Sequence, residues 1–276
     1  MCMICFPNAK INLGLHITGK RPDGYHSIES VFYPVPLTDA LEVVVSEKTT
    51  FTQTGVQLGI MPDDNLVMKA YALMAEKYKL PAIDIYLKKA IPSGAGLGGG
   101  SADAAFMLKL LCEFYKLPAS EQHLLEMAAI LGADCPFFIH NKPLLATGFG
   151  NIFQPCEVSL KGYVLCIVKP PFSISTKEAY SGVIPKKPDF SLQNLSALPV
   201  FEWKTVLKND FEPNMVKRYP FIGRIKDDLY AMGAEYASMT GSGSAVYGIF
   251  KNTVTLFKNT VTPLFHDCFV WQGILG

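Results

Sequence analysis

Apolar and polar residues alternate over residues 8–18, close to the start of the 276-residue chain. The apolar side chains occupy every second position, at Ala9, Ile11, Leu13, Leu15 and Ile17. Successive side chains of a β-strand point to opposite sides, so the pattern predicts a strand with one apolar and one polar side. Lys10 and Asn12 belong to the polar side. From this stretch alone, a solvent-facing lysine and a functional lysine are equally good interpretations of Lys10.

A glycine-rich loop lies between a predicted strand and a predicted helix. The apolar run 83–87 precedes it, and five of the seven residues from Gly94 to Gly100 are glycine. One helical face after the loop would carry Ala102, Ala105, Phe106 and Leu110. We therefore expect a helix that begins at Ser101, with its hydroxyl at the N-cap. Glycines let the backbone approach a ligand closely, and a helix N-terminus offers free N–H groups, so the stretch is typical of a phosphate-binding loop. A glycine-rich surface loop without a ligand is the simpler alternative.

Known sequence signatures distinguish the classes of protein to which this phosphate-binding loop could belong. A Walker loop needs a lysine before its last Ser or Thr, whereas Gly100 precedes Ser101 here. The pattern Gly94-x-Gly96-x-x-Gly99 matches a dinucleotide-binding fingerprint. That fingerprint requires a second strand ending in an acidic residue about 20 residues later. A helix is predicted there instead, which leaves an oxidoreductase as a weak alternative. The motifs of protein kinases are missing.

The remaining pattern predicts strands and helices mixed along the chain. Strands are expected at 27–36, 41–46, 246–250 and, as a pair, within 153–168. Helices are expected from a cap at Asp63 or Asp64 to Tyr78, at 120–131 before a C-cap glycine at Gly132, after a cap at Thr176, after 209–212, and at 221–232. The proline-containing segment 185–199 is expected to connect elements or to form a lid. The order predicts a mixed α/β fold in one large or two ordinary domains.

Two further stretches stand out in the second half. Residues 240–245, Thr-Gly-Ser-Gly-Ser-Ala, form a second glycine loop directly before a predicted strand. The hexapeptide Phe-Lys-Asn-Thr-Val-Thr occurs at 250–255 and again at 257–262. This duplication is too short for a solenoid repeat, and we assign it no function.

Composition excludes several classes of protein. The chain is 49% hydrophobic and 18% charged, with a formal net charge of +1, so a disordered chain and a nucleic-acid-binding protein are disfavoured. Its seven cysteines are odd in number, and the one Cys-x-x-Cys, at residues 2–5, has no second pair of Cys or His residues at a metal-binding spacing, which suggests neither a zinc site nor a disulfide framework. Reduced thiols, no signal-peptide pattern and no long apolar run predict a cytoplasmic protein without a membrane partner.

Three polar or aromatic residues are candidates for chemistry. Asp134 stands between a helix end and an apolar run, where a carboxylate is costly unless it is paired. It either bonds its own turn or is held against Lys10. Tyr25 and His26 follow the turn cluster 19–24 and would bind a planar ring or simply pack.

Three motifs together resemble the GHMP kinases, a family of ATP-dependent small-molecule kinases. They are Pro7–Leu13 (Pro-Asn-Ala-Lys-Ile-Asn-Leu), Pro92–Ala105 and Thr240–Ser244. Three more motifs are similar to one branch of that family, whose substrate is a cytidine diphosphate sugar alcohol. These are Arg21–His26, Asp64–Leu66 and Leu131–Phe137.

The resemblance implies a two-domain GHMP kinase fold with the active site in the cleft between the domains. Residues 1–150 would form the ATP-binding domain, and residues 151–276 would contribute to substrate binding. The partners would be ATP, Mg²⁺ bound with the nucleotide, and the cytidyl substrate. No metal-ligating residue is assigned, and a monomer and a homodimer remain open.

The resemblance also implies roles for matched residues. Lys10 and Asp134 would be the catalytic pair, with Asp134 as the base that takes the proton of the substrate hydroxyl. The expected ATP-binding residues are Asn65, Lys89, Pro92, Ser93, Gly94, Ala95, Gly96, Leu97, Gly98, Gly99, Gly100, Ser101 and Ala102. The expected substrate-binding residues are Asn12, Tyr25, His26, Thr176, Tyr180 and Gly241. Alternatives are a mevalonate- or homoserine-kinase-like enzyme, a dinucleotide-dependent oxidoreductase and a non-catalytic sensor on a kinase fold.

Overall fold

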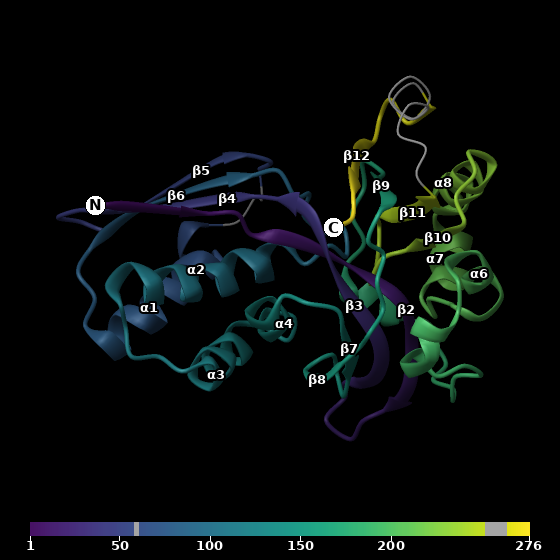
Figure 1. The fold of residues 1–276 in the computed structure, drawn as a ribbon, viewed down its shortest axis with the longest axis horizontal. Helices are drawn as coiled ribbons and strands as arrows, with labels where there is room; N and C mark the ends of the chain where they lie inside the picture. The colour runs from purple at the N-terminus through teal and green to yellow at the C-terminus, as the bar shows by residue number, and fades with distance from the viewer. Residues whose placement is uncertain (58–60, 252–263) are drawn as a thin grey trace. The chain divides into compact units, whose positions relative to one another are not determined.

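A computed structural model describes residues 1–57, 61–251 and 264–276. The strands are β1 Cys2–Cys5, β2 Asn8–Lys20, β3 His26–Thr38, β4 Ala40–Val45, β5 Thr50–Gly55, β6 Ile83–Lys89, β7 Leu144–Thr147, β8 Ile152–Pro155, β9 Tyr163–Lys169, β10 Tyr236–Met239, β11 Val246–Lys251 and β12 Phe269–Ile274. The α-helices are α1 Leu66–Tyr78, α2 Gly99–Tyr115, α3 Glu121–Leu131, α4 Cys135–His140, α5 Thr176–Tyr180, α6 Trp203–Val206, α7 Glu212–Arg218 and α8 Pro220–Ala231. Short 3₁₀ turns occupy Pro62–Asp64, Leu192–Ala197 and Val200–Glu202. Strands and helices are mixed along the chain, as the sequence predicted (Figure 1). Among these residues, no helix is long and apolar enough to cross a membrane.

The chain divides into two compact units that are not contiguous in sequence. The first unit comprises residues Met1–Lys10, Leu37–Ser93 and Gly98–Lys142, and the second comprises Ile11–Pro36, Gly94–Leu97 and Pro143–Gly276. This division differs from the single boundary after residue 150 expected from the sequence, because β2 and β3 each contribute residues to both units. The glycine loop is also shared between them.

The first unit is built on one four-stranded sheet in the order β1-β4-β6-β5. β4 pairs antiparallel with β1 and β6, whereas β5 and β6 are parallel. Alternate residues of β4 and β6 are buried, among them Leu41, Val43, Ile85 and Leu87. Helices α1 and α2 pack against one another on one side of the sheet, and α3 and α4 pack against α2 (Figure 1). The sheet thus positions α2, which follows the glycine loop.

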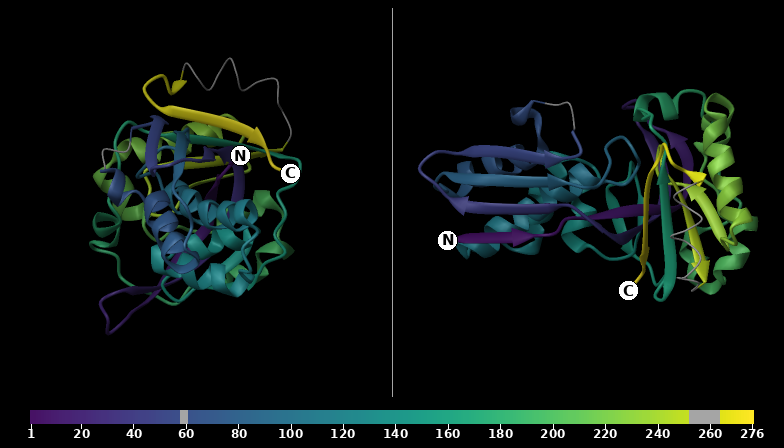
Figure 2. Two further views of the ribbon diagram at one scale, coloured as in Figure 1. Left: turned by 90° about the vertical axis from the view of Figure 1, so that its left-hand side faces the viewer. Right: turned by 90° about the horizontal axis from the view of Figure 1, so that it is seen from above.

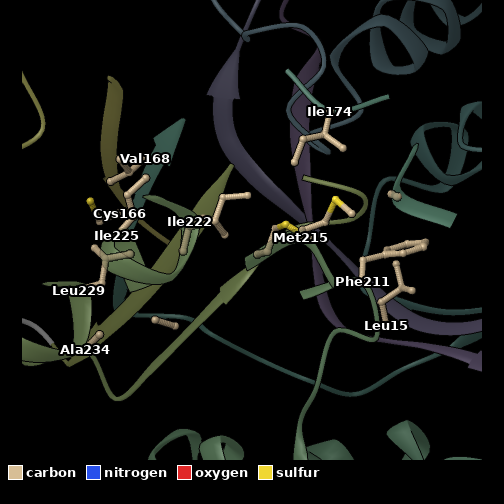
Figure 3. Packing of buried hydrophobic residues seen from close by; sticks show 14 of the residues in the cluster. Leu15, Cys166, Val168, Ile174, Phe211, Met215, Ile222, Ile225, Leu229 and Ala234 are labelled. Carbon is tan, nitrogen blue, oxygen red and sulfur yellow. The ribbon is translucent and has the colours of Figure 1, made fainter. Parts of the chain in front are cut away.

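The second unit contains two further sheets. One has the order β10-β11-β9-β12 with every neighbouring pair antiparallel, and these strands lie side by side in Figure 2. The other has the order β2-β3-β7-β8. Helix α8 packs on β10 and β11, α7 packs against α8, and the hydrophobic core of this unit includes Leu15, Phe211, Met215, Ile225 and Val168 (Figure 3).

Most predicted elements are confirmed, but several of their ends differ. Asn65 caps α1, not Asp63 or Asp64, because the Asn65 Oδ1 accepts the N–H of Val67 at 2.9 Å. Ser175 caps α5, because its hydroxyl accepts the N–H of Glu178 at 3.1 Å, so Thr176 is the first helical residue.

Two loops that the sequence predicted can be described more closely. Gly132 follows α3, but its φ of 171° is extended backbone, so the left-handed freedom of glycine is not used there. The segment 185–199 is not entirely irregular, since residues Leu192–Ala197 form a 3₁₀ turn whose leucines 192 and 195 are fully buried. Most of the duplicated hexapeptide lies outside the described residues.

Strand β2 departs most from its predicted environment. Its apolar side is buried as expected, but the polar side is buried as well: Lys10, Asn12 and His16 are only 2–3% exposed. A simple amphipathic strand would leave these groups in water. Buried polar side chains need partners, and those partners define the candidate site.

Candidate active site

Lys10 and Asp134, 124 positions apart in the sequence, form an ion pair in the first unit. The Lys10 Nζ lies 3.6 Å from the Asp134 Oδ2, and the side chains are 4% and 34% exposed respectively. Burial lowers the pKa of the Lys10 ammonium, and Asp134 partly offsets this effect. The pair therefore joins a desolvated cation to a carboxylate that a ligand can still reach.

The position of Asp134 leaves its carboxylate available. Asp134 occupies the N-cap position of α4, but its helical φ and ψ (−82° and −15°) give no side-chain cap bond. The alternative interpretation, in which the carboxylate accepts a hydrogen bond from its own turn, is therefore wrong. The sharper prediction, a carboxylate held against Lys10, is confirmed.

Gly98 makes room for the lysine. A Cβ on Gly98 would come within 3.2 Å of the Lys10 Cγ and 2.9 Å of the Phe138 Cζ. Gly98 is also the N-cap of α2, with φ 72°, and its carbonyl accepts the N–H of Ala102 at 2.9 Å. The helix thus begins at Gly99, two residues before the predicted start, and Ser101 lies in its first turn and not at the cap. The free N–H groups of this turn adjoin the Lys10 side chain.

The first half of the glycine loop is held by the second glycine loop, within the second unit. The N–H of Ser244 donates to the carbonyl of Gly94, and that of Ala245 donates to the carbonyl of Ala95, both at 3.3 Å. The Thr240 hydroxyl donates to the carbonyl of Gly96 at 3.1 Å. A Cβ on Gly96, whose φ is 74°, would collide with the main-chain carbonyl of Thr240, so this position requires glycine.

Asn12 takes part in the same buried network. Its N–H donates to the Thr240 hydroxyl at 3.1 Å, and its Nδ2 donates to the Ser30 hydroxyl at 2.8 Å. Its carbonyl accepts the Tyr247 hydroxyl at 2.8 Å. Gly241 is close by, because a Cβ there would lie 3.3 Å from the Asn12 Oδ1. The structure brings Asn12 and Gly241 together, and their contact with a substrate stays a prediction.

The Lys89 ammonium is buried, and its expected contact with the nucleotide stays a prediction. Its side chain is 2% exposed, and its Nζ donates to Asp39 and, at 2.6 Å, to Asp103. The ammonium is therefore enclosed by carboxylates of the protein itself. Asn65 is 4% exposed and serves as the cap of α1.

The predicted base-binding residues are only partly brought together. The rings of His26 and Tyr180 stack with centroids 4.7 Å apart and planes 19° apart, and Tyr180 rests edge-on against Phe211. This spacing leaves no room for a base between the two rings, so a base would meet the edge of the histidine. The Tyr25 side chain is 64% exposed, and its ring centroid lies 5.9 Å from that of Phe149.

Several residues of the site escaped the sequence analysis. Asp39 and Asp103 hold Lys89, and Thr240 links the two glycine loops. A signal for Asp103 existed, because it is the single charged residue in an otherwise apolar stretch from Ala102 to Leu108. A buried carboxylate in such a stretch needs a cation, but the sequence does not say which one.

Comparison with known proteins decides the family. A model described as GHMP kinases N terminal domain matches residues 65–142, and one described as GHMP kinases C terminal matches residues 197–258. The chain is 55% identical over 274 residues to the 4-diphosphocytidyl-2-C-methyl-D-erythritol kinase of Parabacteroides distasonis, covering 99% of this chain and 100% of the relative. The chain belongs to the GHMP kinase family. This confirms the resemblance found in the motifs.

Other GHMP kinases agree with this assignment. The protein of the same name from Porphyromonas gingivalis is 47% identical, with 99% of this chain and 100% of the relative covered. A crystal structure of 4-(cytidine 5'-diphospho)-2C-methyl-D-erythritol kinase superposes with a TM-score of 0.83 at 29% identity, covering 99% of both chains. The Methanococcus jannaschii mevalonate kinase shares the fold, with a TM-score of 0.70, 16% identity, and 100% of this chain and 99% of that chain covered. The weak match to a dinucleotide fingerprint is thereby explained as part of a kinase loop.

Proposed function

We propose that this GHMP kinase transfers the γ-phosphoryl group of ATP to the 2-hydroxyl of 4-diphosphocytidyl-2-C-methyl-D-erythritol, giving the 2-phosphate and ADP. The step belongs to the non-mevalonate route to isopentenyl diphosphate. The curated relatives at 47–56% identity carry the name of this activity. The observation that carries the chemistry is the buried Lys10 ammonium against the reachable Asp134 carboxylate, next to the first turn of α2.

The two residues divide the work of phosphoryl transfer. Asp134 accepts the proton of the attacking hydroxyl, which must be lost because a tertiary alcohol is weakly acidic. Lys10 holds Asp134 in place and neutralises charge that develops on the transferring group. Phosphoryl transfer needs little covalent chemistry from the protein, so positioning and charge stabilisation dominate. The main chain from Gly94 to Ser101 supplies N–H donors to the ATP phosphates.

We assign the expected Mg²⁺ to the bound nucleotide and name no protein ligand for it. Among residues 1–57, 61–251 and 264–276, no group of three or more His, Cys, Asp or Glu side chains could hold a metal ion. Mg²⁺ is commonly bound through substrate phosphates and water, with one or two protein ligands at most. We infer that the ion arrives with ATP and is held mainly by phosphate oxygens, where it screens the triphosphate charge.

Substrate recognition is assigned to the second unit. The edge of His26, stacked on Tyr180, offers ring nitrogens to the cytosine, and Tyr25 offers an exposed ring face. Thr176, at the start of the same helix as Tyr180, and Asn12 with Gly241 lie toward the sugar-alcohol portion in this proposal. Within the proposed division of labour, residues 1–150 mainly bind ATP and residues 151–276 contribute to binding of the cytidyl substrate.

We place the enzyme in the cytoplasm, as a monomer or homodimer, with no nucleic-acid or membrane partner.

A coupled assay of ADP release tests the proposed function. The purified chain is given ATP with the cytidyl substrate, mevalonate or homoserine in parallel. Turnover with the cytidyl substrate alone supports the proposal, whereas preferential turnover of mevalonate or homoserine would replace it with another GHMP activity. Binding of NAD(P)H in place of ATP would revive the oxidoreductase, and binding without turnover of any alcohol would indicate a sensor.

A further inference from the structure

A buried carboxylate anchors the main chain just before the glycine loop. Asp39, whose side chain is fully buried, accepts the N–H groups of Ala90 and Ile91 through its Oδ1, at 2.5 and 2.9 Å. Its Oδ2 accepts the ammonium of Lys89. Three consecutive residues that lead to Pro92 are thereby bound to one side chain.

The same ammonium reaches helix α2. The Lys89 Nζ donates to the Asp103 Oδ2 at 2.6 Å, and Asp103 lies on the second turn of α2. The triad Lys89–Asp39–Asp103 therefore ties the chain before the loop to the helix after it, entirely within the first unit. Each of its three side chains is at most 2% exposed.

The charges in this triad do not balance. Two carboxylates face one ammonium in a site without solvent, where an excess negative charge is strongly unfavourable. The Asp103 Oδ1 is buried and accepts no hydrogen bond. The Asp103 and Asp39 carboxylates accept hydrogen bonds from the same Lys89 ammonium, so the two groups adjoin each other. A proton on Asp103 would satisfy this oxygen and remove the excess charge.

The surroundings of Asp103 favour that proton. Burial raises its pKa, Lys89 on β6 lowers it and Asp39 raises it, with a net value of about 7. The Cys5 thiol on β1 also faces Asp103, and its own pKa is raised to about 12 by burial and by Asp103, so it stays neutral. Lys109 and Glu113 on α2 act on Cys5 with opposite signs.

We propose that Asp103 is a neutral carboxylic acid in the nucleotide-competent enzyme and donates a hydrogen bond to Asp39. Ionisation of Asp103 then loosens the contacts that hold the main chain before the ATP loop. Asp39 and Asp103 are positioning residues in this account: they fix the main chain at residues 89–91 and the start of α2. The effect on ATP rests on the proposed function, whereas the protonation state of Asp103 does not. The triad titrates as a unit, so its pH response belongs to both carboxylates together.

The sign of the pH effect follows from the raised pKa. Between the ordinary carboxyl value of 3.8 and about 7, the folded protein binds a proton that the unfolded chain has released. Stability therefore falls as pH rises through this window and then levels off. Asp103→Asn keeps the shape of the side chain and a hydrogen-bond donor toward Asp39, but the side chain no longer titrates. Its stability relative to the natural chain should rise with pH across the window.

The protonation state can be measured without any substrate. The infrared spectrum of the protein should contain a protonated-carboxyl C=O band at about pH 6 that disappears by about pH 8.5. The band should be missing in Asp103→Asn and kept in Asp227→Asn, a control on an exposed helix position. Absence of the band in the natural chain at about pH 6, where ordinary carboxyl groups are ionised, would overturn the proposal, even if no variant folded.

The consequence for ATP is measured by the pH profile of the KM for ATP. In the natural chain and in Asp227→Asn, it should rise at least about fivefold from about pH 6 to about pH 8.5, because the competent fraction falls. In Asp103→Asn it should stay constant over that range. A variant that keeps the full pH dependence would overturn the proposal. Lack of turnover in every protein would instead contradict the proposed function, and the infrared result would still decide the state of Asp103.

Discussion

The Nζ of Lys10 lies 3.6 Å from the Oδ2 of Asp134, and only the carboxylate of the pair has substantial exposure, 34% against 4%. The lysine is packed beside Gly98 and Phe138, so it is a fixed charge and not a mobile surface group. The carboxylate projects from the start of α4 without a cap bond. This asymmetry suits a pair in which Lys10 holds the carboxylate in place and Asp134 exchanges a proton with a ligand.

Replacement of Lys10 by methionine should separate chemistry from stability. We expect kcat to fall at least about 10²-fold, because the charge on the transferring group loses its stabilisation. The free energy of unfolding should not fall, since a desolvated ammonium is removed and Asp134 can be solvated by water. Steady-state kinetics and thermal unfolding of the same preparation measure both. A loss of turnover that merely follows a loss of folded protein would contradict the assigned role.

Gly96→Ala should damage the phosphate loop through the main chain. The added Cβ would meet the Thr240 carbonyl in a backbone of φ 74°, so unfolding free energy should drop by at least about 2 kcal/mol and the KM for ATP should rise. Gly19→Ala is the matched control, because its Cβ would have only Ser27 nearby, at 3.9 Å. Denaturant unfolding compares the two. Equal behaviour of both variants would show that the close approach of the two loops is not required.

Tyr25→Ala should weaken binding of the cytidyl substrate. Loss of one exposed stacking face is expected to raise the KM for that substrate about three- to tenfold, with the KM for ATP unchanged. Phe201→Ala, which removes another exposed ring (53% against 64% for Tyr25), is the control. An unchanged KM in Tyr25→Ala would remove this residue from the base-binding site.

Asp210 should contribute to stability in a pH-dependent way. Burial alone would raise its pKa, but the nearby His16 ring, whose Nδ1 lies 3.8 Å from the Asp210 Oδ1, and the hydrogen bond from the Ile17 N–H outweigh that effect and lower it. A lowered carboxyl pKa stabilises the fold above the ordinary value of 3.8, and this stability is lost as pH falls through the folded-state value.

Asp210→Asn should therefore destabilise the protein at neutral pH by about 1.5–3 kcal/mol, the range for hydrogen bonds to charged groups. The difference from the natural chain should shrink as pH is lowered below 3.8. Denaturant midpoints measured at several pH values test this. A difference that is independent of pH would assign the loss to packing and not to the charge.

Local patterns of the sequence predicted the elements well. Strand β2, helix α3 and the loop-to-helix transition before α2 follow from periodicity, a cap residue and glycines, all of which act over a few neighbouring residues. The motifs also indicated that Lys10 and Asp134 belong together. Burial of Lys10 could not be read from β2 itself, because it depends on Phe138 and Gly98, far away in the sequence.

The errors have the same origin. Ser101 and Thr176 looked like good caps, but Gly98 and Ser175 have the backbone geometry that a cap needs. The burial of Lys89 between Asp39 and Asp103 was likewise not foreseen from the sequence. Partners supplied by distant segments decide such cases, and a single sequence does not contain their distances.

The most direct test of the central claim is the single-turnover rate of Asp134→Asn with ATP and the cytidyl substrate both saturating. Asparagine has nearly the same shape but cannot accept the proton, so the rate should fall at least about 10²-fold while the affinity for ATP changes little. A variant that transfers the phosphoryl group at the rate of the natural chain would contradict the assignment of Asp134 as the base.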